Sequence, residues 1–84
     1  MTHTPNKLYL DIPAHYQVRV QGRLDERFSD RLGGMTIAHA SQGDEPAVTI
    51  LEGQLPDQAA LFGVLNYLYG LHLSLLSVVC LAIG

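Results

Sequence analysis

The sequence predicts an α+β domain, in which an antiparallel sheet in a β-β-β-α-β order carries one helix packed on one face. Residues from Tyr16 onward alternate between the two sides of a strand with a period of two, which is typical of a half-buried strand. Pro56 and Asp57 precede apolar residues at helical spacing. Residues 58–84 carry no Lys, Arg, Asp or Glu, so this tail either packs in a core or enters a membrane.

A chain of 84 residues allows one domain, which we expect at 15–84 after a flexible N-terminal arm at 1–14. A core this small leaves an isolated fold marginal, and self-association is therefore expected. The formal net charge is -3 and only five residues are Lys or Arg. The positive field that attracts phosphate backbones is missing, so the sequence predicts no nucleic-acid partner.

Three strands are predicted before the helix. The first starts at Tyr16, and the second runs from Met35 to Ala40. Residues 41–46 form the turn of a hairpin, and Ala47–Leu55 forms the third strand. Alternation places Thr49, Leu51, Gly53 and Leu55 on one face of that strand and Val48, Ile50, Glu52 and Gln54 on the other. Gly22 and Gly53 are expected to let the covering helix approach the sheet closely.

The segment between the first two strands is charged and precedes Gly33 and Gly34. Apolar residues recur every four positions in it, which predicts one helical turn held to the core by Phe28.

The predicted helix begins after Pro56 and Asp57 and ends at Gly70. Its expected core-facing stripe comprises Leu61, Val64, Leu65, Leu68 and Leu71, whereas Phe62, Tyr67 and Tyr69 fall outside that stripe. The apolar, β-branched run from Leu73 to Ile83 predicts a buried final strand.

Two segments resemble a family of small uncharacterised bacterial proteins. The family's first motif, G-x-L-D-x-x-W-S-x-x-F-G-G-L-x-I, is similar to Gly22 through Ile37, with Phe28 in place of tryptophan and Leu32 in place of phenylalanine. The second motif, D-Q-A-A-L-x-G-L-L, is similar to the stretch that starts at Asp57. The resemblance covers roughly Tyr16 to Val79 and implies a soluble α+β architecture with no established activity.

The charged segment offers the best local candidate for a ligand site. Its candidate residues are Asp25, Arg27, Ser29 and Asp30. The competing interpretation is structural, with the aspartates capping a turn and the arginines pairing with neighbouring carboxylates. The four histidines are not spaced as metal ligands, and Cys80 has no neighbouring cation to activate it, so no metal, cofactor or catalytic residue is predicted. We expect the Cys80 thiol to be buried and inert.

Apolar residues outside the expected core indicate an interface. The candidate residues are Val48, Ile50, Phe62, Tyr67 and Tyr69. A single cysteine and the absence of a signal-like N-terminus favour the cytoplasm. The sequence therefore predicts a cytoplasmic, non-catalytic interaction module that forms a homodimer, with an unidentified protein partner as a further expectation.

Two other functions remain open at this stage. Residues 61–83 are long enough to cross ~30 Å of hydrocarbon, which would make a small membrane-anchored protein. Polar side chains at Asn66, His72, Ser74 and Ser77 oppose that assignment. Alternatively, the 23–34 loop could serve a ligand-binding or enzymatic dimer, with its pocket shared between chains.

Overall fold

The computed structural model describes residues 11–40 and 47–84. The elements are β1 (Ala14–Gln21), the 3-10 helix η1 (Glu26–Leu32), β2 (Thr36–Ala40), β3 (Val48–Leu55), α2 (Gln58–Gly70) and β4 (Ser74–Ile83). The predicted α+β class is confirmed. The chain order is β-η-β-β-α-β, and η1 lies in the segment where one helical turn was expected. The predicted hairpin turn at 41–46 and most of the predicted arm lie outside the described residues.

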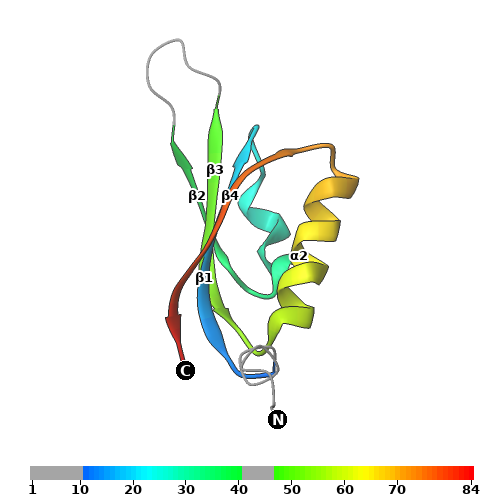
Figure 1. The fold of residues 1–84 in the computed structure, drawn as a ribbon. Coiled ribbons are helices and arrows are strands. Elements are labelled where there is room, and N and C mark those ends of the chain that lie inside the picture. Colours follow the sequence, from blue (N-terminus) through cyan, green and yellow to red (C-terminus); the bar gives the residue numbers. More distant parts are fainter. Residues whose placement is uncertain (1–10, 41–46) are drawn as a thin grey trace.

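The four strands form one sheet in the order β2-β3-β1-β4, and every neighbouring pair is antiparallel. Because β3 and β4 are both antiparallel to β1, they run parallel to each other with β1 between them. A connection between parallel strands has to cross the sheet, and α2 makes that crossing. Helix α2 therefore covers one face of the sheet, and η1 lies on the same face, as Figure 1 shows. Strands β2 and β4 are the two edges.

The central strands have the predicted alternation. On β1 the side chains of Ala14, Tyr16, Val18 and Val20 are buried, and the residues between them are half-buried or exposed. On β3, Thr49, Leu51 and Leu55 are buried, whereas Val48 and Ile50 are only half-buried on the other face. The register joins the two buried rows, with Val18 opposite Leu51. The core therefore fills the space between one face of this sheet and the two helices.

A buried threonine fixes the exit of the chain from β1. The Thr49 hydroxyl is fully buried, accepts a hydrogen bond from the Leu24 amide at 3.0 Å and donates to the Gly22 carbonyl at 2.7 Å. His39 Nε2 lies 2.6 Å from the Leu24 carbonyl and donates to it, which requires the proton on that nitrogen. Each of these polar groups thus has a partner, and β2 and β3 together hold the backbone around Leu24 in place.

Asp25 and Gly33 cap the two ends of helix η1. The Asp25 side chain caps its start, and Gly33 ends it at φ 68°, a left-handed conformation that glycine adopts without strain. Leu32 is fully buried, whereas Phe28, which we expected to hold the segment, is half-buried. A side chain on Gly53 would meet the backbone of Met35 at 3.1 Å. Gly53 therefore permits a close approach by Met35, which follows η1. The expected close approach of α2 to Gly53 is not observed.

Helix α2 starts where the sequence predicts. The Asp57 carboxylate accepts a hydrogen bond from the Ala60 amide at 2.9 Å, which satisfies one free donor of the first turn. Leu61, Val64 and Leu68 are buried, but Leu65 is half-buried and Leu71 is exposed, so the predicted stripe was too wide. After Gly70 the left-handed position is occupied by His72 at φ 64°, whose amide donates to the Tyr69 carbonyl.

The prediction of a buried final strand is wrong. Strand β4 has one half-buried residue, Ser77, and its other nine residues are exposed. It occupies an edge of the sheet, so one side has no neighbouring strand among the described residues. The predicted buried Cys80 lies on β4 and is exposed as well. An apolar run of this length does not by itself distinguish a buried strand from an exposed edge strand.

Candidate functional site

Strand β4 carries six of the nine large apolar side chains that are exposed among the described residues. Its exposed large side chains are Leu75, Leu76, Val78, Val79, Leu81 and Ile83, with exposed fractions from 38% to 53%. The strand has ten residues and contains no charged residue and no proline. Folded proteins usually protect an edge strand with charges, proline, short length, a β-bulge or a covering segment. Within residues 11–40 and 47–84, β4 has two register irregularities against β1, but it is long and has no charge, proline or covering segment.

The apolar side chains of β4 occupy both faces of the sheet. Leu75, Val78 and Ile83 lie opposite the buried β1 residues Val20, Val18 and Ala14, so they share the face that α2 covers further along the sheet. Val79 lies opposite Gln17 and therefore belongs to the other face. A strand that is apolar on both faces is typical of a sheet with both faces covered, and β4 lacks such cover among the described residues.

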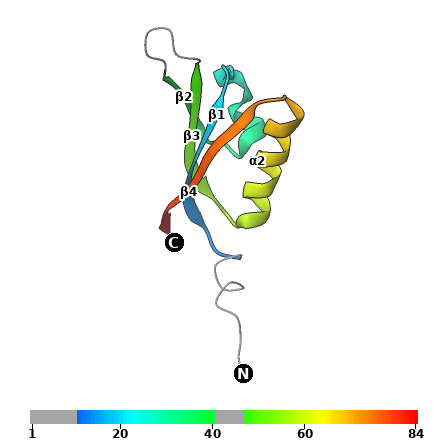
Figure 2. The same cartoon turned by 45° about the horizontal axis from the view of Figure 1, so that its top comes forward.

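Helix α2 adds two aromatic side chains to this surface. Phe62 is 57% exposed and Tyr69 is 81% exposed, and seven residues, or two helical turns, separate them on one side of α2. A groove with a volume of about 720 Å³ lies between the end of α2 and the start of β4, and Leu65, Tyr69, Leu73 and Leu75 contribute to its lining. Figure 2 shows how the chain passes from α2 into β4 at this end of the molecule. We call β4 together with Phe62 and Tyr69 the β4 surface.

The other predicted interface residues lie elsewhere. Val48 and Ile50 are half-buried on the face of β3 that the helices do not cover. Tyr67 packs against the core, with its ring centroid 6.2 Å from that of Phe28, and its hydroxyl accepts a long contact of 3.5 Å from Arg31. The structure thus separates the five candidates. Tyr69 lies beside the start of β4, Phe62 lies two turns earlier on the same side of α2, Val48 and Ile50 lie on the open face, and Tyr67 packs against η1.

The candidate loop residues make local structural contacts. Asp25 Oδ1 accepts from the Arg27 amide at 2.8 Å and lies 3.2 Å from Arg27 Nε. These hydrogen bonds from Arg27, the backbone one first, lower the pKa of the Asp25 carboxyl. Ser29 Oγ donates to the Met35 carbonyl at 2.7 Å, and Asp30 is exposed. Asp25, Arg27 and Ser29 therefore make hydrogen bonds that stabilise η1 and its ends.

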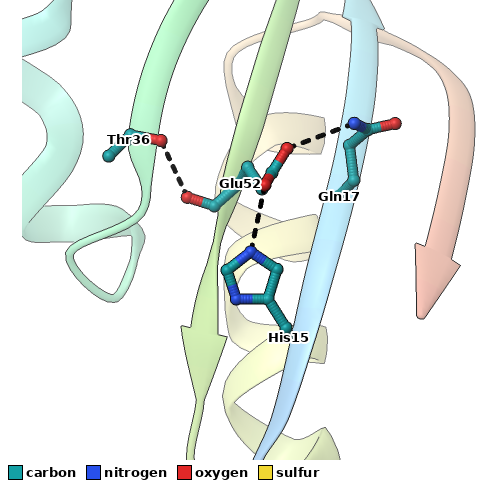
Figure 3. A network of polar contacts seen from close by, with 4 residues as sticks. All are labelled: His15, Gln17, Thr36 and Glu52. Atoms are coloured by element: carbon teal, nitrogen blue, oxygen red, sulfur yellow. Dashed lines mark hydrogen bonds and ion pairs between the residues drawn. The ribbon is translucent and has the colours of Figure 1, made fainter. Parts of the chain in front are cut away.

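A polar network that the sequence analysis did not identify lies on the open face of the sheet (Figure 3). Glu52 accepts from Gln17 Nε2 at 3.2 Å and lies 3.1 Å from His15 Nε2. The hydrogen bond from His15, followed by that from Gln17, lowers the pKa of the Glu52 carboxyl. Thr36 donates to the Glu52 backbone carbonyl at 2.9 Å. These contacts join β1, β2 and β3 side by side.

The chemistry of this network is limited by its setting. His15 and Glu52 are 39% and 42% exposed at the side chain, so water competes for both groups. Among the described residues, no group of three or more His, Cys, Asp or Glu side chains could hold a metal ion. The network connects neighbouring strands, and its residues come together only through the register of the sheet, for which no local sequence signal exists.

The predicted membrane span at 61–83 is divided between a helix and a strand. Helix α2 has 13 residues, and β4 follows it after a short turn. In the part of the chain that the structure describes, no helix has the length and apolar character needed to cross a bilayer.

Comparison with known proteins places the chain in a family without assigning an activity. It matches no curated protein and no solved structure. A family model matches residues 15–79, which run from β1 to the middle of β4 and include both helices. The chain therefore belongs to the family described as a domain of unknown function, DUF8691.

Proposed function

We propose that this protein is a non-catalytic self-association module, and that two copies join through the β4 surface. The observation that carries the proposal is the ten-residue edge strand, uncharged and with six large apolar side chains exposed to water. Such an edge is a template for pairing with another strand, because its free N–H and C=O groups and its apolar side chains gain partners together.

The size of the β4 surface is adequate for a dimer. A strand of ten residues is ~34 Å long at ~3.4 Å per residue. The side of a sheet with one helix layer is ~20 Å wide, because layers pack ~10 Å apart. The resulting area of ~700 Å² is close to the ~800 Å² that each partner buries in a stable interface of standard size.

A second copy is favoured as the occupant because the surface carries no charge. Two identical charged patches would repel each other at a two-fold contact, whereas β4, Phe62 and Tyr69 present only neutral side chains. In this proposal the protein acts in the cytoplasm, where reducing conditions would keep the exposed Cys80 as a free thiol.

Sedimentation of lysine variants tests the proposal. Leu81→Lys and Tyr69→Lys place a charge on β4 and on α2 within the β4 surface, and each charge appears twice in a symmetric dimer. Ile50→Lys is the control, because it places the same charge on the open face of β3. The native protein and the control should sediment as dimers at tens of micromolar, and the other two variants should shift toward monomers with unchanged circular dichroism.

Two results would contradict the proposal. A native protein that sediments as a monomer at this concentration would remove it, and the edge would then be reserved for a different chain. A dimer that Ile50→Lys dissociates, and that Leu81→Lys and Tyr69→Lys leave intact, would move the interface to the open face of the sheet.

A further inference from the structure

Along β1, the backbone N–H and C=O groups of successive residues point alternately toward β3 and toward β4. The Gly22 amide donates to the Ala47 carbonyl at 2.8 Å, on the β3 side. The Gly84 amide donates to the Pro13 carbonyl at 2.8 Å, on the β4 side. Residues of an antiparallel strand alternate between pointing their N–H and C=O groups at one neighbour and at the other. The backbone groups of even-numbered β1 residues therefore point toward β3, and those of odd-numbered residues point toward β4. Both hydrogen bonds agree with this assignment.

The same alternation shows which residues of β4 face its free edge. Residues opposite odd-numbered β1 positions turn their backbone groups inward, and these are Ser74, Ser77, Val79 and Ala82. Residues opposite even-numbered positions turn theirs outward, and these are Leu75, Val78, Cys80 and Ile83. The register shifts twice, leaving Leu76 and Leu81 without a partner on β1. Each shift inserts one extra residue into β4, as a β-bulge does.

The outward-facing set is symmetric about Val79. Val78 and Cys80 are one residue away from it on either side, and Leu75 and Ile83 are four residues away on either side. The bulges preserve this symmetry, because one extra residue is inserted in each half of the strand. Two β4 strands can therefore be placed antiparallel with Val79 opposite the partner's Val79. Each residue whose backbone groups point outward then lies opposite a partner residue whose groups also point outward.

We infer that β4 pairs antiparallel with β4 of a second copy around a two-fold axis at Val79, so that two four-stranded sheets become one sheet of eight strands. This inference rests on the proposed self-association and specifies its geometry. Val78 lies opposite the partner's Cys80, and Leu75 lies opposite the partner's Ile83, so the pairs on the helix-covered face are apolar. The contact is isologous and closes on itself, which limits assembly through this edge to a dimer.

The axis position makes a prediction about distances. Val79 and the partner's Val79 form a pair without direct hydrogen bonds, and the Cα atoms of such pairs are ~4.5 Å apart with both side chains on the same face. That distance lies within the ~4.4–6.8 Å at which disulfides form. Ser77 is on the same face as Val79, but Ser77 and the partner's Ser77 are four residues apart along the strands, or ~14 Å.

Oxidative cross-linking tests this register. The variants are Val79→Cys and Ser77→Cys, each combined with Cys80→Ser so that a single thiol remains on β4. The Val79→Cys protein should convert almost completely to a disulfide-linked dimer under mild oxidation, and at least tenfold faster than the Ser77→Cys protein. Circular dichroism and sedimentation of the reduced proteins establish that both variants are folded and dimeric.

The outcomes separate this inference from the proposed function. A native protein that sediments as a monomer removes both. A native dimer in which Val79→Cys cross-links no faster than Ser77→Cys overturns the register and leaves self-association standing. Rapid cross-linking of the native protein through Cys80 would overturn it as well, because that result places the axis at Cys80. In the register centred on Val79, the two Cys80 Cα atoms are ~8 Å apart, which is too far for a disulfide.

Discussion

Truncation of Leu68 tests how α2 is packed. Leu68 is 2% exposed and belongs to the core, whereas Leu65, one turn earlier, is half-buried and borders the groove beside β4. Removing a fully buried leucine side chain costs ~2–5 kcal/mol. Removing one that already contacts water costs ~1–2 kcal/mol, because less apolar area returns to solvent. A domain of 84 residues has a total stability of ~4–13 kcal/mol.

Leu68→Ala should therefore remove a large share of the free energy of unfolding, and Leu65→Ala a smaller share. With a urea dependence of ~1 kcal/mol per molar, the unfolding midpoint should fall by ~2 M or more for Leu68→Ala and by ~1–2 M for Leu65→Ala. The exposed Asn66 provides the control, and Asn66→Ala should leave the midpoint within ~0.5 M. The assay is urea denaturation followed by circular dichroism, at one protein concentration because the stability of the proposed dimer would depend on concentration. A larger loss for Leu65→Ala than for Leu68→Ala would mean that α2 is rotated about its axis.

Three further predictions follow from local contacts. Asp25→Asn should keep the melting temperature within a few degrees, because asparagine also caps a helix start, whereas Asp25→Ala should lower it further; equal losses would show that the cap contributes nothing. The pKa of Glu52 is lowered in the folded state, so its contribution to stability is present above the pKa of the unfolded chain and is lost as the pH falls through the folded value. Glu52→Gln should therefore reduce the loss of stability between pH 5 and pH 3 that denaturant titrations measure in the native protein, and an unchanged pH profile would contradict this assignment. His72→Gly should raise stability by ~0.5–1 kcal/mol, because glycine adopts a φ of 64° without strain; a lower melting temperature would show that the His72 side chain has a stabilising role in the groove.

The sequence predicts the elements well where local chemistry decides them. Alternation in β1 and β3 marks the buried rows that include Val18 and Leu51, and Asp57 marks the start of α2. Each of these signals depends on residues close in the chain, so tertiary contacts do not need to be known. The phase of α2 is less well predicted, because apolar residues occur around most of the helix and the stripe wrongly includes Leu71.

The place of β4 could not be predicted from its residues. A fully buried strand and an exposed edge strand can both appear as an apolar run, and only the strand order distinguishes them. The same order explains why Cys80 is exposed and why Tyr69 lies beside uncovered surface. The network of His15 and Glu52 depends on register between strands 37 residues apart in sequence, which no local pattern reports.

Hydrogen exchange at individual amides tests the central claim, that the free edge of β4 is paired in solution. Val78 and Val79 are adjacent, but the Val78 amide faces the free edge and the Val79 amide faces β1. We predict that the Val79 amide is protected at all protein concentrations, whereas the Val78 amide is protected at hundreds of micromolar and loses its protection on dilution to monomer. A Val78 amide that exchanges at the rate of an unstructured chain, while sedimentation shows a dimer, would contradict the account.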